Sequence, residues 1–189
     1  MSNLVICGTS GAGKTFLEEY LENHMECMPL PKYFDREIRP RERKDKNISV
    51  SRDTWMDMRD EFFFTLAYDH HNYGWKKSDL QTGKVSTLAI TLESLGRFME
   101  QNSDFIPILL WVGHDNLELI HTRMEKRGET KEKIAERLEL ARDEIARGDE
   151  YKKIVKDNMG WLVNVKSDLS VFEEVIPRTM KLLTSKPLL

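Results

Sequence analysis

The chain has few cysteines, no long apolar run and no marked excess of one charge. Its two cysteines, Cys7 and Cys27, exclude a disulfide framework and are typical of the reducing cytosol. No apolar run approaches the roughly 20 residues of a membrane-spanning helix, and the first residues lack the basic and apolar segments of a secretion signal. The 29 basic and 32 acidic residues give a net charge of −3, which provides no bulk attraction for nucleic acid or anionic lipid. We therefore expect a cytoplasmic protein that binds neither nucleic acid nor a membrane.

Size and hydrophobic patterning favour a single α/β domain. The 189 residues are 40% hydrophobic and 32% charged, which is typical of a globular chain. Strand-like and helix-like segments alternate along the sequence, as they do when helices flank a parallel sheet. The patterning predicts strands over 4–7, 32–34, 48–50, 65–68, 85–92, 105–112 and 161–165, and a turn at 72–74. It predicts helices over 16–25, 52–61, 78–83, 92–101, 115–126, 130–147 and 169–183.

A glycine-rich loop follows the first predicted strand and precedes the first predicted helix. It fits the pattern G-x-x-x-x-G-K-[ST] at every fixed position, and its residues are Gly8, Thr9, Ser10, Gly11, Ala12, Gly13, Lys14 and Thr15. Small residues let the backbone wrap a phosphate group, and the helix that follows presents its positive end to the same anion. Lys14 would then reach the β- and γ-phosphates, and the Thr15 hydroxyl would ligate Mg²⁺. The motif predicts binding of a nucleoside triphosphate.

Several cationic residues lie before and after Gly128 in the sequence, on two predicted helices. Phosphoryl transfer requires cations near the moving group, because negative charge spreads over its oxygens in the transition state. A helical hairpin that carries arginines can close over a bound nucleotide as a lid, although composition alone favours a solvated charged hairpin. The cations are Arg123, Lys126, Arg127, Arg137 and Arg142.

With these motifs, the chain resembles the guanylate kinase family over nearly its whole length. The resemblance rests on the loop at 8–15, Arg36-Glu37-Ile38-Arg39 with Glu42, the stretch 47–51, Tyr73-Gly74, Arg127-Gly128, 136–138 and Val163-Asn164. It implies a P-loop NTPase fold with an acceptor-binding insertion over about 32–83 and a lid over about 123–142. It also implies transfer of the ATP γ-phosphoryl group to a nucleoside monophosphate or another small phosphorylated acceptor, with Mg²⁺.

The resemblance also implies roles for individual residues. Lys14, Arg127 and Arg137 would be catalytic, and Asn164 would join the loop in binding the nucleotide. The acceptor phosphate would be held by Arg36, Arg39 and Tyr73, although a second register would use Arg39 and Arg41. A tyrosine that the family places near Asn47 is absent, and Lys44 or Lys46 could replace it.

The positions that read guanine in the family differ in this chain. Phe64 and Trp75 occupy the places of a Glu and a Ser/Thr, and 89–91 replaces an Asp-x-Asp. Rings cannot hydrogen-bond to the Watson–Crick edge, so weak discrimination of GMP is predicted unless Asp69 or Thr91 reads the base instead. The alternatives are a kinase resembling ribose 1,5-bisphosphate phosphokinases and a binding module without catalysis.

Overall fold

The structure is a computed structural model that describes residues 3–40 and 42–166 and the positions 173, 177 and 181. Its larger sheet has five strands, all parallel, in the order β2-β7-β1-β8-β9. These strands are β1 (Asn3–Gly8), β2 (Met28–Pro29), β7 (Ser86–Ile90), β8 (Phe105–Trp111) and β9 (Trp161–Asn164). The predicted α/β class with a parallel sheet is confirmed.

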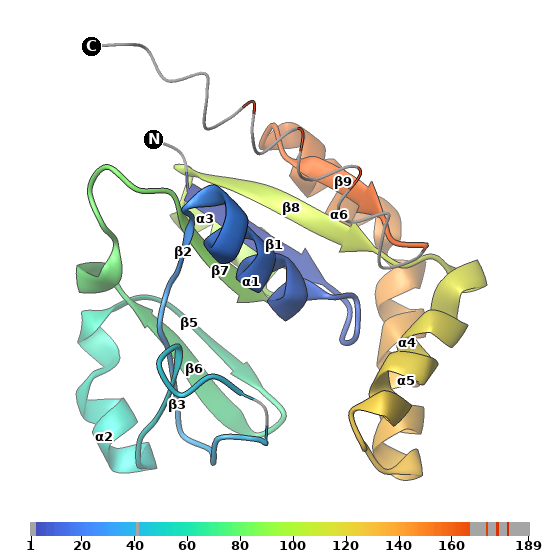
Figure 1. Cartoon of the computed structure of the whole chain (residues 1–189), viewed down its shortest axis with the longest axis horizontal. Helices are drawn as coiled ribbons and strands as arrows, with labels where there is room; N and C mark the ends of the chain where they lie inside the picture. The colour runs from blue at the N-terminus through green and yellow to red at the C-terminus, as the bar shows by residue number, and fades with distance from the viewer. Residues whose placement is uncertain (1–2, 41, 167–172, 174–176, 178–180, 182–189) are drawn as a thin grey trace.

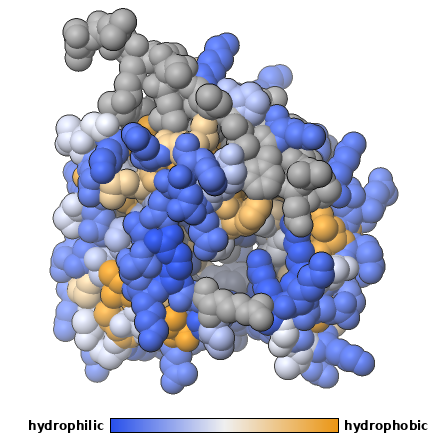
Figure 2. Space-filling model, in the orientation of Figure 1, coloured by the Kyte–Doolittle hydropathy of each residue, from blue (hydrophilic) through white to orange (hydrophobic). Residues whose placement is uncertain are grey.

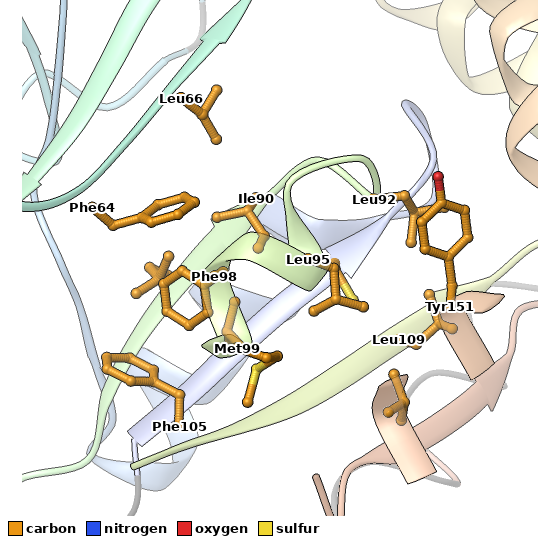
Figure 3. Close-up of a cluster of buried hydrophobic side chains, with 14 of the residues drawn as sticks. Phe64, Leu66, Ile90, Leu92, Leu95, Phe98, Met99, Phe105, Leu109 and Tyr151 are labelled. Atoms are coloured by element: carbon orange, nitrogen blue, oxygen red, sulfur yellow. The ribbon is translucent and has the colours of Figure 1, made fainter. Parts of the chain in front are cut away.

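Helices cover both faces of this sheet, and strand β1 shows why. Successive side chains of a strand point to opposite faces. Leu4 and Ile6 therefore pack in one hydrophobic cluster with Leu17 of α1, whereas Cys7 packs on the other face with Leu95 of α3. Figure 1 shows how α1 and α3 run beside the sheet. Figure 3 shows Leu95, Phe98 and Met99 of α3 in the hydrophobic cluster that also contains Cys7. The longer helices are α1 (Lys14–Met25), α3 (Leu95–Gln101), α4 (Leu117–Lys126), α5 (Lys131–Ala146) and α6 (Gly148–Asp157).

A smaller sheet of four strands is formed by the middle of the chain. Its order is β4-β3-β6-β5, with β3 and β4 parallel and the other pairs antiparallel. The strands are β3 (Lys32–Phe34), β4 (Asn47–Ser49), β5 (Phe62–Tyr68) and β6 (His71–Lys76), and helix α2 (Arg52–Asp57) follows β4. Ser51 caps α2, which begins at the predicted residue 52, because its Oγ accepts a hydrogen bond from the Thr54 N–H at 3.1 Å.

The predicted turn at 72–74 was wrong, because these residues lie inside β6. Strand β6 pairs with both β3 and β5, and Tyr73 is buried. The turn lies instead at Asp69 and His70, whose φ angles of 54° and 63° place both in the left-handed region. Two consecutive left-handed residues form the tight hairpin turn that matches the twist of the flanking strands. Gly74 is needed for packing, because a Cβ there would lie 2.6 Å from the Phe62 ring.

Other boundaries also differ from the predictions. Only a 3₁₀ turn, η2 (Lys77–Asp79), lies in the predicted helix 78–83, and α3 begins at Leu95. Asp115 does not cap a helix: it lies in the 3₁₀ turn η3 (His114–Asn116), after which α4 begins. Helix α6 was not predicted. Of the predicted helix 169–183, the structure describes only the positions 173, 177 and 181, each of which is helical.

The outer surface is mainly polar. Figure 2 shows hydrophilic side chains over most of the face that it presents. Among the described residues, no helix is both long enough and apolar enough to cross a membrane.

Candidate active site

The loop between β1 and α1 has the geometry of an anion cradle. Gly11 and Gly13 have φ angles of 84° and 106°, which side chains rarely adopt. Gly13 precedes α1 without any side-chain cap, so the first N–H groups of the helix are directed toward the loop. In Figure 1 this loop lies between the four-stranded sheet and the helices α4 and α5.

Lys14 lies back over the loop and has an acidic neighbour. Its Nζ donates to the carbonyl oxygens of Gly8 and Thr9, at 2.6 and 2.9 Å. Burial lowers the pKa of Lys14, and the negative charge of Glu144 on α5 acts in the opposite direction. Burial also raises the pKa of Glu144, which Lys14 in turn lowers. The Oε2 atom of Glu144 is buried and has no hydrogen-bond partner within the described part of the chain.

Two arginines of the predicted lid contact the phosphate loop. Arg123 donates to the Gly11 carbonyl at 2.8 Å, and Arg137 Nη1 donates to Ser10 Oγ at 2.5 Å. The Arg137 side chain is 8% exposed, and its Nε lies 3.1 Å from a carboxylate oxygen of Glu129. Arg127, the C-cap of α4, is exposed, but its charge acts on Lys14. The structure thus brings Arg123 and Arg137 into contact with the loop, whereas Arg127 acts on Lys14 only through its charge.

Arg36 and Tyr73, which come from separate segments, are in direct contact. Arg36 Nε donates to the Tyr73 hydroxyl at 3.1 Å. The two terminal nitrogens of Arg36 donate to the two carboxylate oxygens of Glu42, at 2.8 and 2.6 Å. A paired fork of this kind fixes the plane of the guanidinium. The structure therefore brings together two of the three residues assigned to the acceptor phosphate.

Arg39 is placed differently from Arg36. Its side chain is 46% exposed, and its Nη2 lies 3.9 Å from Asp69 Oδ2. Asp69 also accepts a hydrogen bond from Lys133 of α5 at 3.0 Å, so this turn of the small sheet is linked to the lid. Arg41, on which the second register depends, lies outside the described residues.

A cavity lies between α1 and the small sheet. It is lined by Thr15, Glu18, Glu19, Pro29, Leu30, Lys32, Glu42, Arg43, Lys46, Asn47, Trp75 and Ala89. Lys46 reaches it, whereas Lys44 is exposed and does not line it. Of the two rings at the predicted base-reading positions, only Trp75 lines this cavity.

The remaining predicted residues lie away from this cavity. Phe64 is 2% exposed and packs edge-on against Phe98, with ring centroids 4.8 Å apart. The Thr91 hydroxyl is paired with that of Ser94 at 3.0 Å. Asn164 is exposed at the carboxyl end of β9, beside Trp111 of β8.

Sequence reasoning missed three charged residues of the site. Glu18, Lys32 and Glu144 are single charges that belong to no motif, and only the packing of distant segments gives them a place at the site.

The chain is similar to curated kinases. A guanylate kinase of Sulfurimonas denitrificans is 31% identical over 166 residues, which cover 82% of this chain and 80% of the relative. The chain belongs to the guanylate kinase family. Guanylate kinases of Nostoc sp. and Nitrosospira multiformis are each 27% identical, over 82% and 80% of this chain and 82% and 75% of their own lengths. No family model matches the chain.

The fold agrees with this membership. The crystal structure of a guanylate kinase from Anaplasma phagocytophilum superimposes with a TM-score of 0.65 at 17% identity, covering 98% of this chain and 87% of that one. This likeness confirms the P-loop NTPase fold that the sequence resemblance implied. As a guanylate kinase family member, the chain is an enzyme, a nucleoside monophosphate kinase. The relatives do not favour the sugar-phosphate kinase or the non-catalytic module.

Proposed function

We propose that the enzyme transfers the γ-phosphoryl group of ATP to a nucleoside monophosphate in the cytoplasm, with GMP and dGMP as the first acceptors to test. One observation carries this proposal: Arg137 of the lid donates to Ser10 of the phosphate loop. A lid arginine and the loop thus meet at the place where the last phosphate of a loop-bound triphosphate would lie.

The donor side follows from the loop. The backbone N–H groups of 8–15 would bind the phosphates, Lys14 would bridge the β- and γ-phosphates, and Asn164 would lie near the rest of the nucleotide. The acceptor phosphate oxygen attacks the γ-phosphorus, the bond from that phosphorus to the β–γ bridging oxygen breaks, and ADP leaves. Lys14, Arg127 and Arg137 would stabilise the charge that develops, so positioning and electrostatics carry the catalysis without a covalent intermediate.

The residues at the loop fit a magnesium ion. The Thr15 hydroxyl is exposed, lines the cavity and makes no hydrogen bond within the described residues. It would therefore hold Mg²⁺ together with phosphate oxygens, and the ion would supply further positive charge to them.

Arg36→Ala is expected to raise the KM for the acceptor by about 10- to 100-fold, because a charge-assisted hydrogen bond contributes about 1.5–3 kcal/mol. The phosphate of the bound acceptor is already fully charged, so kcat should change much less. Steady-state kinetics with varied acceptor would measure both parameters. An unchanged KM with a lowered kcat would contradict this role for Arg36. Thermal unfolding would show whether loss of the Glu42 contact destabilises the fold.

As the pH rises, the affinity for ATP is expected to fall at a lower pH in Glu144→Gln than in the wild type. The Glu144 carboxylate favours the charged form of Lys14, so its removal lets burial lower the Lys14 pKa further. The ammonium is then lost earlier as the pH rises. Calorimetry of ATP binding between about pH 6.5 and 9 measures this shift, with the exposed Asp149→Asn as control. Coincident pH profiles would show that Glu144 does not act on Lys14.

A coupled ADP-release assay tests the proposed function. The acceptors are GMP, dGMP, AMP, CMP, UMP, dTMP and ribose 1,5-bisphosphate, each with ATP and Mg²⁺. We expect at least one nucleoside monophosphate to support turnover well above the rate with ATP alone. Turnover with ribose 1,5-bisphosphate alone would overturn the proposal in favour of a sugar-phosphate kinase.

A further inference from the structure

Three of the six charged side chains that line the cavity between α1 and the small sheet, Glu42, Arg43 and Lys46, are engaged in other contacts. Glu42 holds Arg36, and Arg43 is paired with both Glu22 and Asp45. Lys46 donates to the Pro29 carbonyl at 3.2 Å and lies 3.5 Å from Glu22. These groups build the wall of the cavity, and their hydrogen-bonding capacity is largely used.

Glu18 and Lys32 differ from these three residues. Within the part of the chain that the structure describes, neither side chain makes a hydrogen bond or an ion pair, although their opposite charges attract. Burial raises the pKa of Glu18 to about 7 and lowers that of Lys32, and each charge counters the shift of the other. Lys32 Nζ lies 5.9 Å from the Phe34 ring centroid. Both residues are partly exposed and line the cavity. A charge with reduced access to water and no hydrogen-bonding partner is costly, so this pair points to a ligand.

The walls beside this pair suit a flat aromatic ligand. Trp75, Leu30 and Ala89 line the same cavity with apolar atoms. Trp75 and Leu30 are almost fully buried behind it, and Ala89 is partly exposed. Trp75 also stands at a position that the family resemblance assigns to the acceptor base. Phe64, at the other such position, is buried in the core and cannot reach a base. Asp69 accepts a hydrogen bond from Lys133, and the Thr91 hydroxyl is paired with that of Ser94. Neither Asp69 nor Thr91 lines the cavity.

We propose that Glu18, together with Lys32, is the residue that determines which acceptor base this cavity accepts, and that this pair matches the edge of guanine. The Glu18 carboxylate accepts hydrogen bonds from the guanine N1–H and 2-amino groups, one on each oxygen, while the Lys32 ammonium donates to O6. Adenine and cytosine each have one amino group beside an unprotonated ring nitrogen, so they satisfy only one carboxylate oxygen. This inference rests on the proposed function, because it identifies the cavity as the acceptor site.

Calorimetric binding of GMP, IMP and AMP to the wild type and to Glu18→Gln tests the assignment. IMP lacks the 2-amino group but keeps N1–H and O6. The wild type should bind GMP at least about 10-fold more tightly than IMP, and IMP more tightly than AMP. The glutamine places an N–H₂ group against the guanine 2-amino group, so GMP affinity should fall about 10- to 100-fold. IMP should lose less, because the glutamine carbonyl still accepts from N1–H, and AMP should change little.

Three results would overturn the assignment. They are a wild type that binds AMP as tightly as GMP, an unchanged GMP affinity in Glu18→Gln, and an equal loss for all three nucleotides. The first is what base reading by Phe64 and Trp75 alone predicts. Retained ATP binding shows that the variant is folded, and Asp149→Asn controls for the lost charge. Glu18-dependent GMP binding without turnover would refute the kinase proposal alone, whereas turnover of GMP without Glu18 dependence would refute only this assignment.

Discussion

Lys14→Ala is expected to lower kcat by about 10³-fold while the protein remains folded. The ammonium is held over the loop by the Gly8 and Thr9 carbonyls, at 2.6 and 2.9 Å, so it is in place before substrate binds. Its removal takes away a preorganised positive charge where the β- and γ-phosphates would lie. Single-turnover kinetics with saturating ATP and acceptor measures the loss. Circular dichroism shows whether the fold is kept.

Lys153→Ala is the control for Lys14. This residue carries the same side chain on the outer face of α6, where it is 77% exposed and paired with Asp157. It should leave kcat unchanged. Near-normal turnover in Lys14→Ala would show that the loop is not the catalytic centre.

Arg137→Ala is expected to lower kcat by about 10²- to 10³-fold, with only a small change in the KM for the acceptor. Ser10 and Glu129 hold the guanidinium beside the loop, at 2.5 and 3.1 Å. A cation fixed there acts mainly on charge that develops in the transition state. Initial rates over a grid of ATP and acceptor concentrations separate kcat from KM. A raised KM with an unchanged kcat would move Arg137 from catalysis to substrate binding.

Arg137 has a matched control on the same helix. Arg142 was a candidate lid cation from the sequence, but the structure leaves it exposed. Arg142→Ala should therefore keep full activity. Arg137→Lys should recover part of the rate lost in Arg137→Ala, since lysine restores one positive charge but not the planar fork.

The elements predicted correctly are those with a local signal. The phosphate loop could be located because its glycines and Lys14 are fixed by backbone conformation and charge over a few residues. The helix starts at Ser51 and Thr130 could be predicted because each side chain accepts a hydrogen bond from an N–H three residues ahead. Strand β1 could be predicted because its run of apolar residues, 4–7, is short and ends at the glycine-rich loop.

The features that were missed depend on distant partners. Asn72-Tyr73-Gly74 is typical of a turn by composition, but strand pairing on both sides makes it the centre of the small sheet. Helix α6 is rich in charge and was not predicted, because Tyr151 and Val155 are buried only where this helix packs against α3, β8 and β9. The single charges Glu18, Lys32 and Glu144 belong to no motif, so only the folded chain shows what surrounds them.

Transfer of labelled phosphate tests the central claim most directly. The enzyme is incubated with Mg²⁺, GMP and ATP that carries a label on its γ-phosphate, and the products are separated by chromatography. We expect the label to appear at the β-position of GDP, at a rate that Lys14→Ala reduces by about 10³-fold. Label found only as inorganic phosphate with every nucleoside monophosphate, at a rate that does not depend on Lys14, would contradict the account.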